Sequence, residues 1–460
     1  MLNIRRVIVA VSGGVDSAVA ALILKKKGYD VVGVFMQNWD TADETGICSA
    51  TQDAEDARWV CSRLGIPFSV VSFVREYWND VFCNLLEDYQ NGYTPNPDIL
   101  CNGHIKFDKF LKYAQDNLDA DAIATGHYAS TTFGSFLENC DFSAGVHLLK
   151  PRDLFKDQTF FLSQVSQIPL QKTMFPLANL TKTQVKKIAS EYGMDYISKK
   201  KESSGICFIG TRHFQNFISE YLNDSPGYFR DIDSGVIVGR HAGIHHWTIG
   251  QRCRIGGQLK PYYVARKEPK NNDIFVASGT NHLSLFTNLF FTSRPHWIHS
   301  VPYLLMQEGV LECEFRFQHT KPLVRCELVA IQSDHLLVKL EKSLRAITPG
   351  QYAVFYKGRE CLGSARITDL GSSLQSLGCD EQKILVNNAH KDIPNTQHMV
   401  VVITEDVQNV HLLLEYRPHI DVSLTCEHDP KLQVLAYVLR TCHNSILKGF
   451  QIRHQRRINQ

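Results

Sequence analysis

Residues 7–17 read VIVAVSGGVDS, and this segment indicates the fold class more strongly than any other part of the chain. Its first five residues, Val7 to Val11, are apolar and mostly β-branched, which is typical of a buried parallel strand. A glycine-rich turn follows, and residues 18–27 then have the pattern of a helix that ends at Gly28. The segment therefore predicts a strand, a tight turn and a helix.

The turn between this strand and this helix has the features of an anion site. Gly13 and Gly14 expose backbone N–H groups at the start of a helix, where a phosphate is favourably bound. Ser12 and Ser17 add hydroxyl donors. The lysine of the GxxxxGK[ST] loop is missing, so the turn is not of the kind found in kinases and GTPases. Taken alone, the turn could also be an ordinary glycine turn of an α/β protein.

The first part of the chain alternates strand and helix patterns, which predicts a doubly wound parallel sheet. Further strands are expected at residues 30–36, 68–71 and 122–125, with helices at 51–64 and 181–192. The second of these helices is expected to open with a capping box formed by Thr181 and Gln184. Ligands of such sheets bind at the carboxyl ends of the strands. Ala10, Met36 and Gly126 fall at such ends and are therefore candidates for lining a nucleotide pocket.

The pattern changes after about residue 212. Short strand-like runs between Gly, Asp and Asn turns predict two small β-barrel-like units, at residues 213–283 and 284–370. We expect the α/β unit to span residues 1–212. Residues 371–460 form an extension of unknown role that ends in a basic run.

The composition indicates a soluble globular protein without a membrane span. The chain is 44% hydrophobic and 21% charged, with a formal net charge of +2, so nucleic-acid binding would have to come from local patches. Its 13 cysteines are scattered and contain no CxxC pair, which predicts neither a metal site nor a disulfide framework. Residues 1–6, which precede the first strand, contain two arginines, but the segment is too short for an ordinary transit peptide.

Two segments present a cysteine in a setting suited to chemistry. In residues 96–102, Pro97 predicts an extended loop that places the carboxylate of Asp98 near the thiol of Cys101, with Lys106 close enough to lower a thiol pKa. In residues 204–210, glycines flank Cys207, downstream of three lysines. Each segment alone could equally hold a buried structural cysteine. Together with a turn that resembles the adenylating loop of the ATP pyrophosphatases, two loop cysteines suggest sulfur transfer.

Several motifs resemble one family in order along residues 1 to about 370. SGGVDS resembles the pyrophosphate loop of the ATP pyrophosphatases. That motif and the segments TPNPDILCNGHIKF (94–107), ATGHYA (124–129), KDQTFFL (156–162), GICFIG (205–210) and TIGQR (248–252) resemble the tRNA 2-thiouridylases. FMQNWD (35–40) and EYWNDVF (76–82) are most similar to the animal mitochondrial members.

The resemblance implies an ATP pyrophosphatase fold and a tRNA uridine 2-sulfurtransferase activity. ATP with Mg²⁺ would adenylate the C2 oxygen of uridine-34, and a persulfide on Cys207 would replace that oxygen. Cys101 would then form a disulfide with Cys207 or release sulfide, and Asp98 would be the acid–base residue. The residues implied to hold ATP are Ala10, Ser12, Gly13, Gly14, Asp16, Ser17, Met36 and Gly126.

The resemblance also implies partners. These are tRNA, in particular the mitochondrial tRNAs for Lys, Glu and Gln, and a cysteine desulfurase with a persulfide carrier. We expect a monomer in the mitochondrion, with the cytoplasm as the alternative. The residues expected to contact tRNA are His127, Lys156, Asp157, Gln158, Lys199, Lys200 and Arg252.

Two other functions are consistent with an adenylating loop. An ATP-dependent amidotransferase would need an ammonia source but would not need Cys101 or Cys207. An RNA-binding protein on an inactive enzyme scaffold would carry damage in the loop or at the cysteines, and the sequence shows none.

Overall fold

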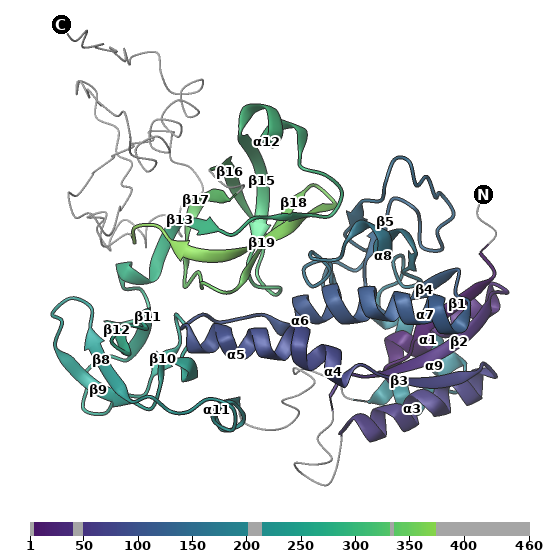
Figure 1. Ribbon diagram of the computed structural model, residues 1–460, viewed down its shortest axis with the longest axis horizontal. Coiled ribbons are helices and arrows are strands. Elements are labelled where there is room, and N and C mark those ends of the chain that lie inside the picture. The colour runs from purple at the N-terminus through teal and green to yellow at the C-terminus, as the bar shows by residue number, and fades with distance from the viewer. Residues whose placement is uncertain (1–3, 40–48, 201–213, 332–334, 374–460) are drawn as a thin grey trace, which may run out of the picture.

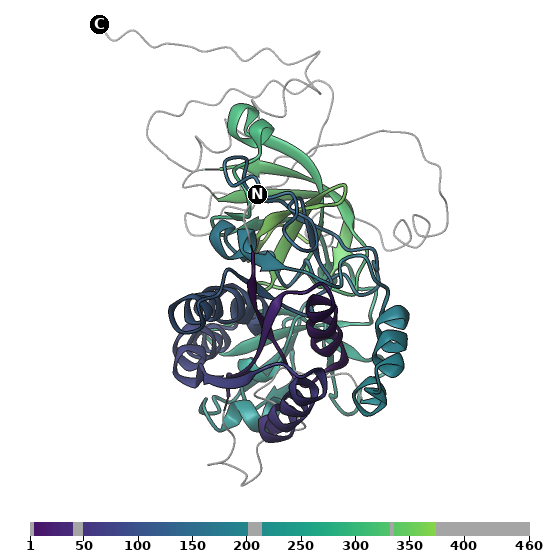
Figure 2. The ribbon, with the colours of Figure 1, turned by 90° about the vertical axis from the view of Figure 1, so that its right-hand side faces the viewer.

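The computed structural model describes residues 4–39, 49–200, 214–331 and 335–373. They form an N-terminal α/β domain, a small central β domain and a C-terminal β-barrel, with the barrel and the central domain on the same side of the α/β domain (Figure 1). Figure 2 shows the barrel above the α/β domain after a quarter turn. No described helix has both the length and the apolar composition required to cross a bilayer.

A five-stranded parallel sheet forms the centre of the α/β domain, as predicted. Its order is β3-β2-β1-β4-β7, and every neighbouring pair is parallel. The strands are β1 (Arg6–Ala10), β2 (Asp30–Gln37), β3 (Phe68–Ser72), β4 (Ala122–Ala124) and β7 (Thr173–Met174). Because β1 lies in the middle of this order, the turn that follows it opens at the centre of the carboxyl edge.

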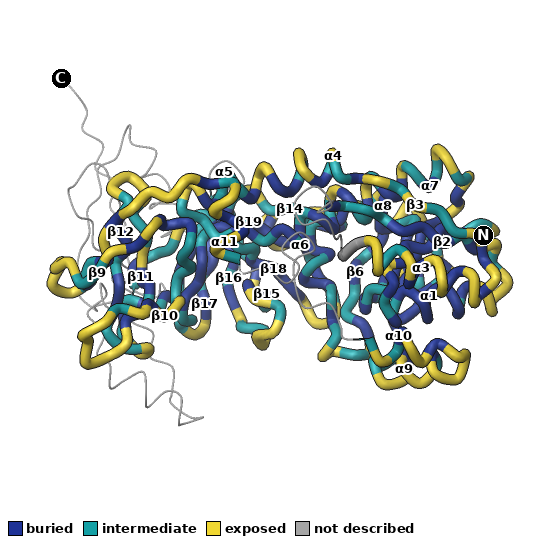
Figure 3. The backbone as a smooth tube through the Cα atoms, turned by 90° about the horizontal axis from the view of Figure 1, so that it is seen from below, coloured by how far each residue is buried: buried dark blue, intermediate teal, exposed yellow. Residues whose placement is uncertain are grey.

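Helices cover both faces of this sheet, because successive side chains of β1 point to opposite sides. Val7 and Val9 pack with the first set of helices, and Ile8 packs with the second. The first set is α1 (Val15–Lys26), α3 (Ser49–Leu64) and α9 (Lys182–Glu191). The second set includes α5 (Cys83–Gln90) and α7 (Phe110–Leu118). Figure 3 shows buried residues around β2 and α1, with exposed residues on the outer faces of helices and on the loops.

The segment around Cys101 is helical, so the predicted extended loop at residues 96–102 was wrong. Pro97 occupies the first position of α6 (Pro97–Leu100), where its missing N–H costs nothing, and the side chain of Asn96 accepts a hydrogen bond from the N–H of Ile99. The helix continues as η2 (Cys101–Lys109), a π-helical stretch, and then as α7. Cys101 is 3% exposed.

The capping box predicted at Thr181 and Gln184 is present at the start of α9. The remaining elements of the α/β domain are short. The short elements are α4 (Val74–Tyr77), η1 (Trp78–Phe82), β5 (Ser130–Thr131), β6 (Leu148–Leu149), α8 (Gln167–Gln171) and α10 (Asp195–Lys199).

The central domain is a five-stranded sheet in the order β10-β11-β12-β8-β9. Its elements are α11 (Phe214–Ser219), β8 (Gly227–Asp231), β9 (Ile237–His241), η3 (Ile244–His246), β10 (Arg252–Cys253), β11 (Tyr262–Glu268) and β12 (Asp273–Ser278). The single turn η3 packs against α5 of the α/β domain.

The C-terminal domain is a closed barrel, because β13 pairs with β17 at one side and with β19 at the other. Its elements are η4 (Leu283–Leu285), β13 (Phe286–Thr292), β14 (His296–Trp297), α12 (Tyr303–Glu308), β15 (Val310–Arg316), β16 (Val324–Ala330), β17 (Leu336–Arg345), β18 (Tyr352–Lys357) and β19 (Glu360–Leu370). Strand β6 of the α/β domain pairs with β19, so the barrel sheet continues into the first domain.

The barrel also holds the segment that leads into α6. The side-chain amide of Gln351 donates to the carbonyls of Thr94 (2.8 Å) and Pro95 (3.0 Å). The N–H of Thr94 donates to the carbonyl of Pro349 at 3.0 Å. An ion pair between Arg366 on β19 and Asp88 joins the end of α5 to the barrel as well. The position of α6 is therefore set by the C-terminal domain.

This contact generates a prediction. Gln351→Ala removes two donors from backbone carbonyls and should lower the free energy of unfolding by about 1–3 kcal/mol. Denaturant titration measures this change. Asn117→Ala is the control, since the side chain of Asn117 bonds one exposed carbonyl within its own helix, and it should change stability much less. Equal effects of the two variants would contradict the assigned role of Gln351.

Candidate active site

The glycine-rich turn after β1 has the geometry of a phosphate-binding loop. Gly13 has a φ of +73°, and a Cβ at this position would come within 2.5 Å of the carbonyl oxygen of Asp53, so only glycine fits. Gly14 caps α1 with an extended backbone. The hydroxyl of Ser17 donates to the carbonyl of Gly14 at 3.0 Å and accepts from the N–H of Ser12 at 3.1 Å. Both serines thus shape the turn.

The neighbouring strand ends lie at this loop. A Cβ on Gly126 would come within 2.6 Å of the backbone nitrogen of Ser17, so the chain leaving β4 lies directly against the first turn of α1. Ala10 ends β1, and Met36 is the penultimate residue of β2. The three residues predicted from strand ends therefore lie on the carboxyl edge of the sheet, around the loop.

Asp16 is the residue that joins the loop to distant parts of the chain. Its carboxylate accepts from Nζ of Lys182 at 2.7 and 2.8 Å and from the hydroxyl of Tyr128 at 2.8 Å. Gln158 in turn bonds both the N–H (2.8 Å) and the carbonyl (3.0 Å) of Tyr128. Lys182 is the first residue of α9, so the capping box of that helix fixes a positive charge beside the loop.

A second lysine lies on the other side of the loop. Lys200 forms ion pairs with Asp53, at 2.7 Å, and with Asp56, both on α3. Burial opposes the charge of Lys200, but the hydrogen bonds to these two carboxylates outweigh burial and raise its pKa. Asp53 is the residue whose carbonyl lies against Gly13. Two lysines from distant segments thus lie beside a loop whose own sequence has none, each paired with aspartate carboxylates.

The helix that carries Asp98 and Cys101 reaches the same edge of the sheet. The ring of Phe107 lies 5.6 Å from the ring of His127, which directly follows Gly126. Burial lowers the pKa of His127 to about 3, and the charge of Lys106 adds to this shift, so His127 is neutral at pH 7. Burial raises the pKa of Asp98, which Lys106 partly opposes. A raised carboxyl pKa suits proton transfer near neutral pH.

The other predicted residues lie in different settings. Asp157 is 3% exposed and pairs with Arg316 at 2.7 Å, while its other oxygen accepts from Thr159. Its carboxylate therefore joins the α/β domain to the barrel and is not available at the surface for RNA. Lys199 and Arg252 are exposed. Cys207, predicted as the persulfide carrier, lies outside the described residues.

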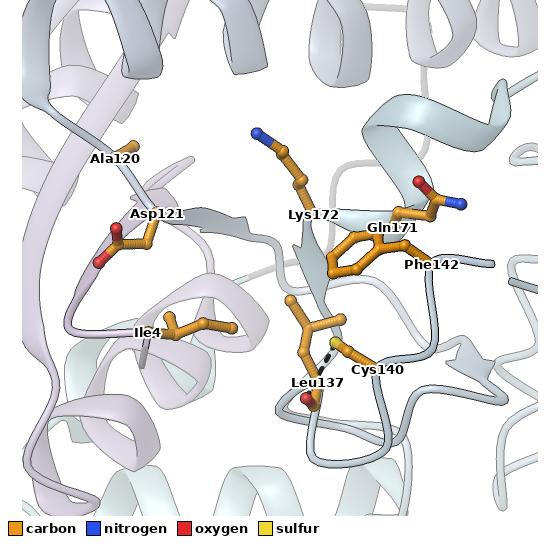
Figure 4. A pocket seen from close by; sticks show the side chains of 8 residues that line it. All are labelled: Ile4, Ala120, Asp121, Leu137, Cys140, Phe142, Gln171 and Lys172. Atoms are coloured by element: carbon orange, nitrogen blue, oxygen red, sulfur yellow. Dashed lines mark hydrogen bonds between the residues drawn. The ribbon is translucent and has the colours of Figure 1, made fainter. Parts of the chain in front are cut away.

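A cavity of about 180 Å³ lies elsewhere in the α/β domain (Figure 4). Its lining includes Ile4, Ala120 and Asp121, which precede β1 and β4, and Cys140, whose thiol donates to the carbonyl of Leu137 at 3.0 Å. These residues stand at the amino ends of the strands. The cavity is therefore at the opposite edge of the sheet from the phosphate loop.

Comparisons with known proteins identify the family of this chain. Residues 5–211 match the family model described as tRNA methyl transferase HUP domain, residues 215–278 the tRNA methyl transferase PRC-barrel domain, and residues 287–367 the aminomethyltransferase beta-barrel domain. The chain is 55% identical to mitochondrial tRNA-specific 2-thiouridylase 1 of Drosophila melanogaster over 79% of this chain and 94% of that protein. Identity to the Homo sapiens protein of that name is 50% over 82% of this chain and 93% of that protein.

This chain belongs to the tRNA-specific 2-thiouridylase family. A solved 4-thiouridine synthetase in complex with RNA and bound ATP is 15% identical, with a TM-score of 0.27 over 47% of this chain and 49% of that chain. The family membership rests on the 2-thiouridylases and not on this structure.

The sequence analysis of this 2-thiouridylase did not predict which residues contact Asp16. Lys182 is 166 residues from Asp16 and Tyr128 is 112 residues away, so only the fold brings them together. The one available signal was the capping box, which placed Lys182 at the first turn of a helix.

We predict that Lys182→Met weakens ATP binding. Losing one charge-assisted hydrogen bond should raise the Kd for ATP about 10- to 100-fold. Isothermal titration with a non-hydrolysable ATP analogue measures this. Lys187→Met is the matched control, since Lys187 lies on the same helix but pairs with Glu191 at 3.8 Å on its exposed face. An unchanged Kd in Lys182→Met would contradict the role of Lys182.

Proposed function

We propose that this chain is a tRNA 2-thiouridylase that converts uridine-34 of mitochondrial tRNAs to 2-thiouridine. The observation that carries the proposal is the intact phosphate loop, with Lys182 and Lys200 around it, in a chain about half identical to enzymes named for this reaction. The names of these relatives favour sulfur transfer over amidotransfer and over an inactive scaffold. They also favour a mitochondrial location.

The residues of the loop fit the triphosphate of ATP. The N–H groups of the turn lie at a helix N-terminus, and Lys182 and Lys200 lie beside it, paired in this structure with Asp16 and with Asp53 and Asp56, from which they can turn to the phosphates. The Asp16 carboxylate at the same loop is suited to orient a Mg²⁺–phosphate complex. ATP supplies the adenylyl group that turns the C2 oxygen of uridine into a leaving group, with pyrophosphate released.

The thiol residues would then complete the exchange. The terminal sulfur of a persulfide on Cys207 attacks C2, and AMP leaves with the former oxygen. The thiolate of Cys101 attacks the remaining sulfur–sulfur bond, which leaves sulfur on C2 and a disulfide between the two cysteines. A reductant must then restore both thiols. Asp98, whose pKa is raised by burial, is placed three residues before Cys101 to accept the proton of N3 or of a thiol.

This scheme predicts that both cysteines are needed for thiolation. With unmodified tRNA, ATP, Mg²⁺ and a persulfide donor, the wild type should produce tRNA that is retarded in a mercury-containing gel. Cys207→Ser and Cys101→Ser should produce none, while both still bind ATP with the wild-type Kd. Cys83→Ser is the control, because Cys83 is exposed on α5 and has no assigned role. Thiolation by Cys207→Ser would refute the persulfide role.

A loop beside the phosphate site is suited to bind the RNA. Phe155 is 97% exposed and Leu154 is 65% exposed, which is unusual for large apolar residues. The first end of this loop is held by hydrogen bonds, because the carboxylate of Asp153 accepts from the backbone N–H groups of Phe155 (3.2 Å) and Lys182 (2.8 Å). Gln158 anchors the other end to Tyr128, so both ends of the loop are held by residues that contact Asp16.

We infer that Phe155 stacks on an unpaired base of the anticodon loop, with Lys156 beside it at the RNA backbone. Bases splayed from RNA loops are commonly bound on aromatic side chains next to basic residues. A base held there would lie close to the loop where its neighbour is adenylated. This role agrees with the expectation that Lys156 and Gln158 lie near tRNA, whereas the buried Asp157 has no part in it.

Phe155→Ala should therefore raise the KM for tRNA about 5- to 100-fold, as expected for the loss of one base-stacking contact. The Kd for ATP and the melting temperature should not change, because the side chain packs against nothing. Phe155→Trp should restore binding. Phe142→Ala is the control, since Phe142 is 43% exposed at the opposite edge of the sheet. Equal KM values for Phe155→Ala and wild type would rule out the stacking contact.

A further inference from the structure

Two histidines and an aspartate converge in the central domain, away from the phosphate loop. His245 and His246 belong to η3, which packs against α5, and Asp224 lies between α11 and β8. One potential ligand atom from each of the three residues lies within 4.8 Å of the others. The site is formed by two segments about 20 residues apart in sequence, joined by strands β8 and β9.

The donor atoms are close to the spacing that a tetrahedral metal ion requires. Oδ1 of Asp224 lies 2.8 Å from Nε2 of His246 and 3.5 Å from Nε2 of His245. With zinc–ligand bonds of about 2.0–2.1 Å, tetrahedral donors stand about 3.4 Å apart. The two imidazole rings have their centroids 4.0 Å apart and are tilted by 47°.

The site also contains a buried nitrogen with only a long polar contact. His245 is 5% exposed, and its Nε2 lies 3.5 Å from Oδ1 of Asp224 without the geometry of a good hydrogen bond to any described residue. Burying a nitrogen that is so weakly paired is costly, and a metal ion at this point would supply a stronger partner. A Cβ on Gly243 would come within 2.5 Å of the ring of His245, which shows that the backbone is shaped to hold this ring close.

We propose that Asp224, His245 and His246 bind one Zn²⁺ ion, with water at the fourth position on the exposed side of Asp224. Two imidazoles and a carboxylate form a donor set that Zn²⁺ favours. The ion joins the start of β8 to η3, and thereby stabilises the face of the central domain that packs on α5. The proposal does not depend on sulfur transfer. Sequence pattern alone does not indicate this site, because adjacent histidines and a distant aspartate match no metal-ligand spacing.

The alternative is that Asp224 only accepts a hydrogen bond from His246. The test uses the full-length protein, stripped with a chelator and titrated with ZnCl₂ by calorimetry. The wild type should bind one Zn²⁺ more than either Asp224→Asn or His245→Gln. His282→Gln is the matched control, since His282 pairs with Asp233 at 3.0 Å as a single histidine–aspartate pair. It should bind as much Zn²⁺ as the wild type.

Two further measurements separate this site from the cysteines and from misfolding. Co²⁺ bound by nitrogen and oxygen gives visible bands without a thiolate charge-transfer band, and this spectrum should be lost in both variants. The stripped variants should melt at the temperature of the stripped wild type, and added Zn²⁺ should raise the melting temperature of the wild type and of His282→Gln only. Equal Zn²⁺ stoichiometry in wild type and variants, or a Co²⁺ spectrum with thiolate bands alone, would overturn the proposal.

Discussion

The ion pair between Asp16 and Lys182 is the interaction on which the arrangement of the site depends. It joins the first turn of α1 to the first residue of α9, two helices on the same face of the sheet. Tyr128 adds a bond to the same carboxylate, and Gln158 holds Tyr128 through its backbone. The loop, the chain after β4 and the segment before Phe160 are therefore positioned by one small polar network, of which only Lys182 and Asp16 carry charge.

The C-terminal barrel contributes to this site without reaching the phosphate loop. Gln351 holds the carbonyls of Thr94 and Pro95, and Arg316 pairs with the buried Asp157. The first contact sets where α6 starts, and hence where Asp98 and Cys101 stand. The second fixes the base of the loop that carries Phe155. The barrel is thus a support for the two segments around the reaction centre.

Local pattern was sufficient to predict the sheet, the phosphate turn and the capping box, because each depends on residues within one turn or strand. Local pattern failed at residues 96–102, where the proline indicated an extended loop. Pro97 instead begins a helix, because the side chain of Asn96 caps its first turn. Local pattern also failed for Asp157, whose burial follows from Arg316 on another domain. The partners of Asp16 could not be predicted, since they lie more than 100 residues away.

The pairing of β6 with β19 has a consequence for how the chain reaches its native state. Leu148 and Leu149 find their partners at Cys361 and Glu360, more than 200 residues later. Until those residues have been synthesised, the outer edge of β6 is unpaired. The contacts of the α/β domain are therefore complete only after β19 has left the ribosome, and the shortness of β6, at two residues, limits what its open edge can pair with in the meantime.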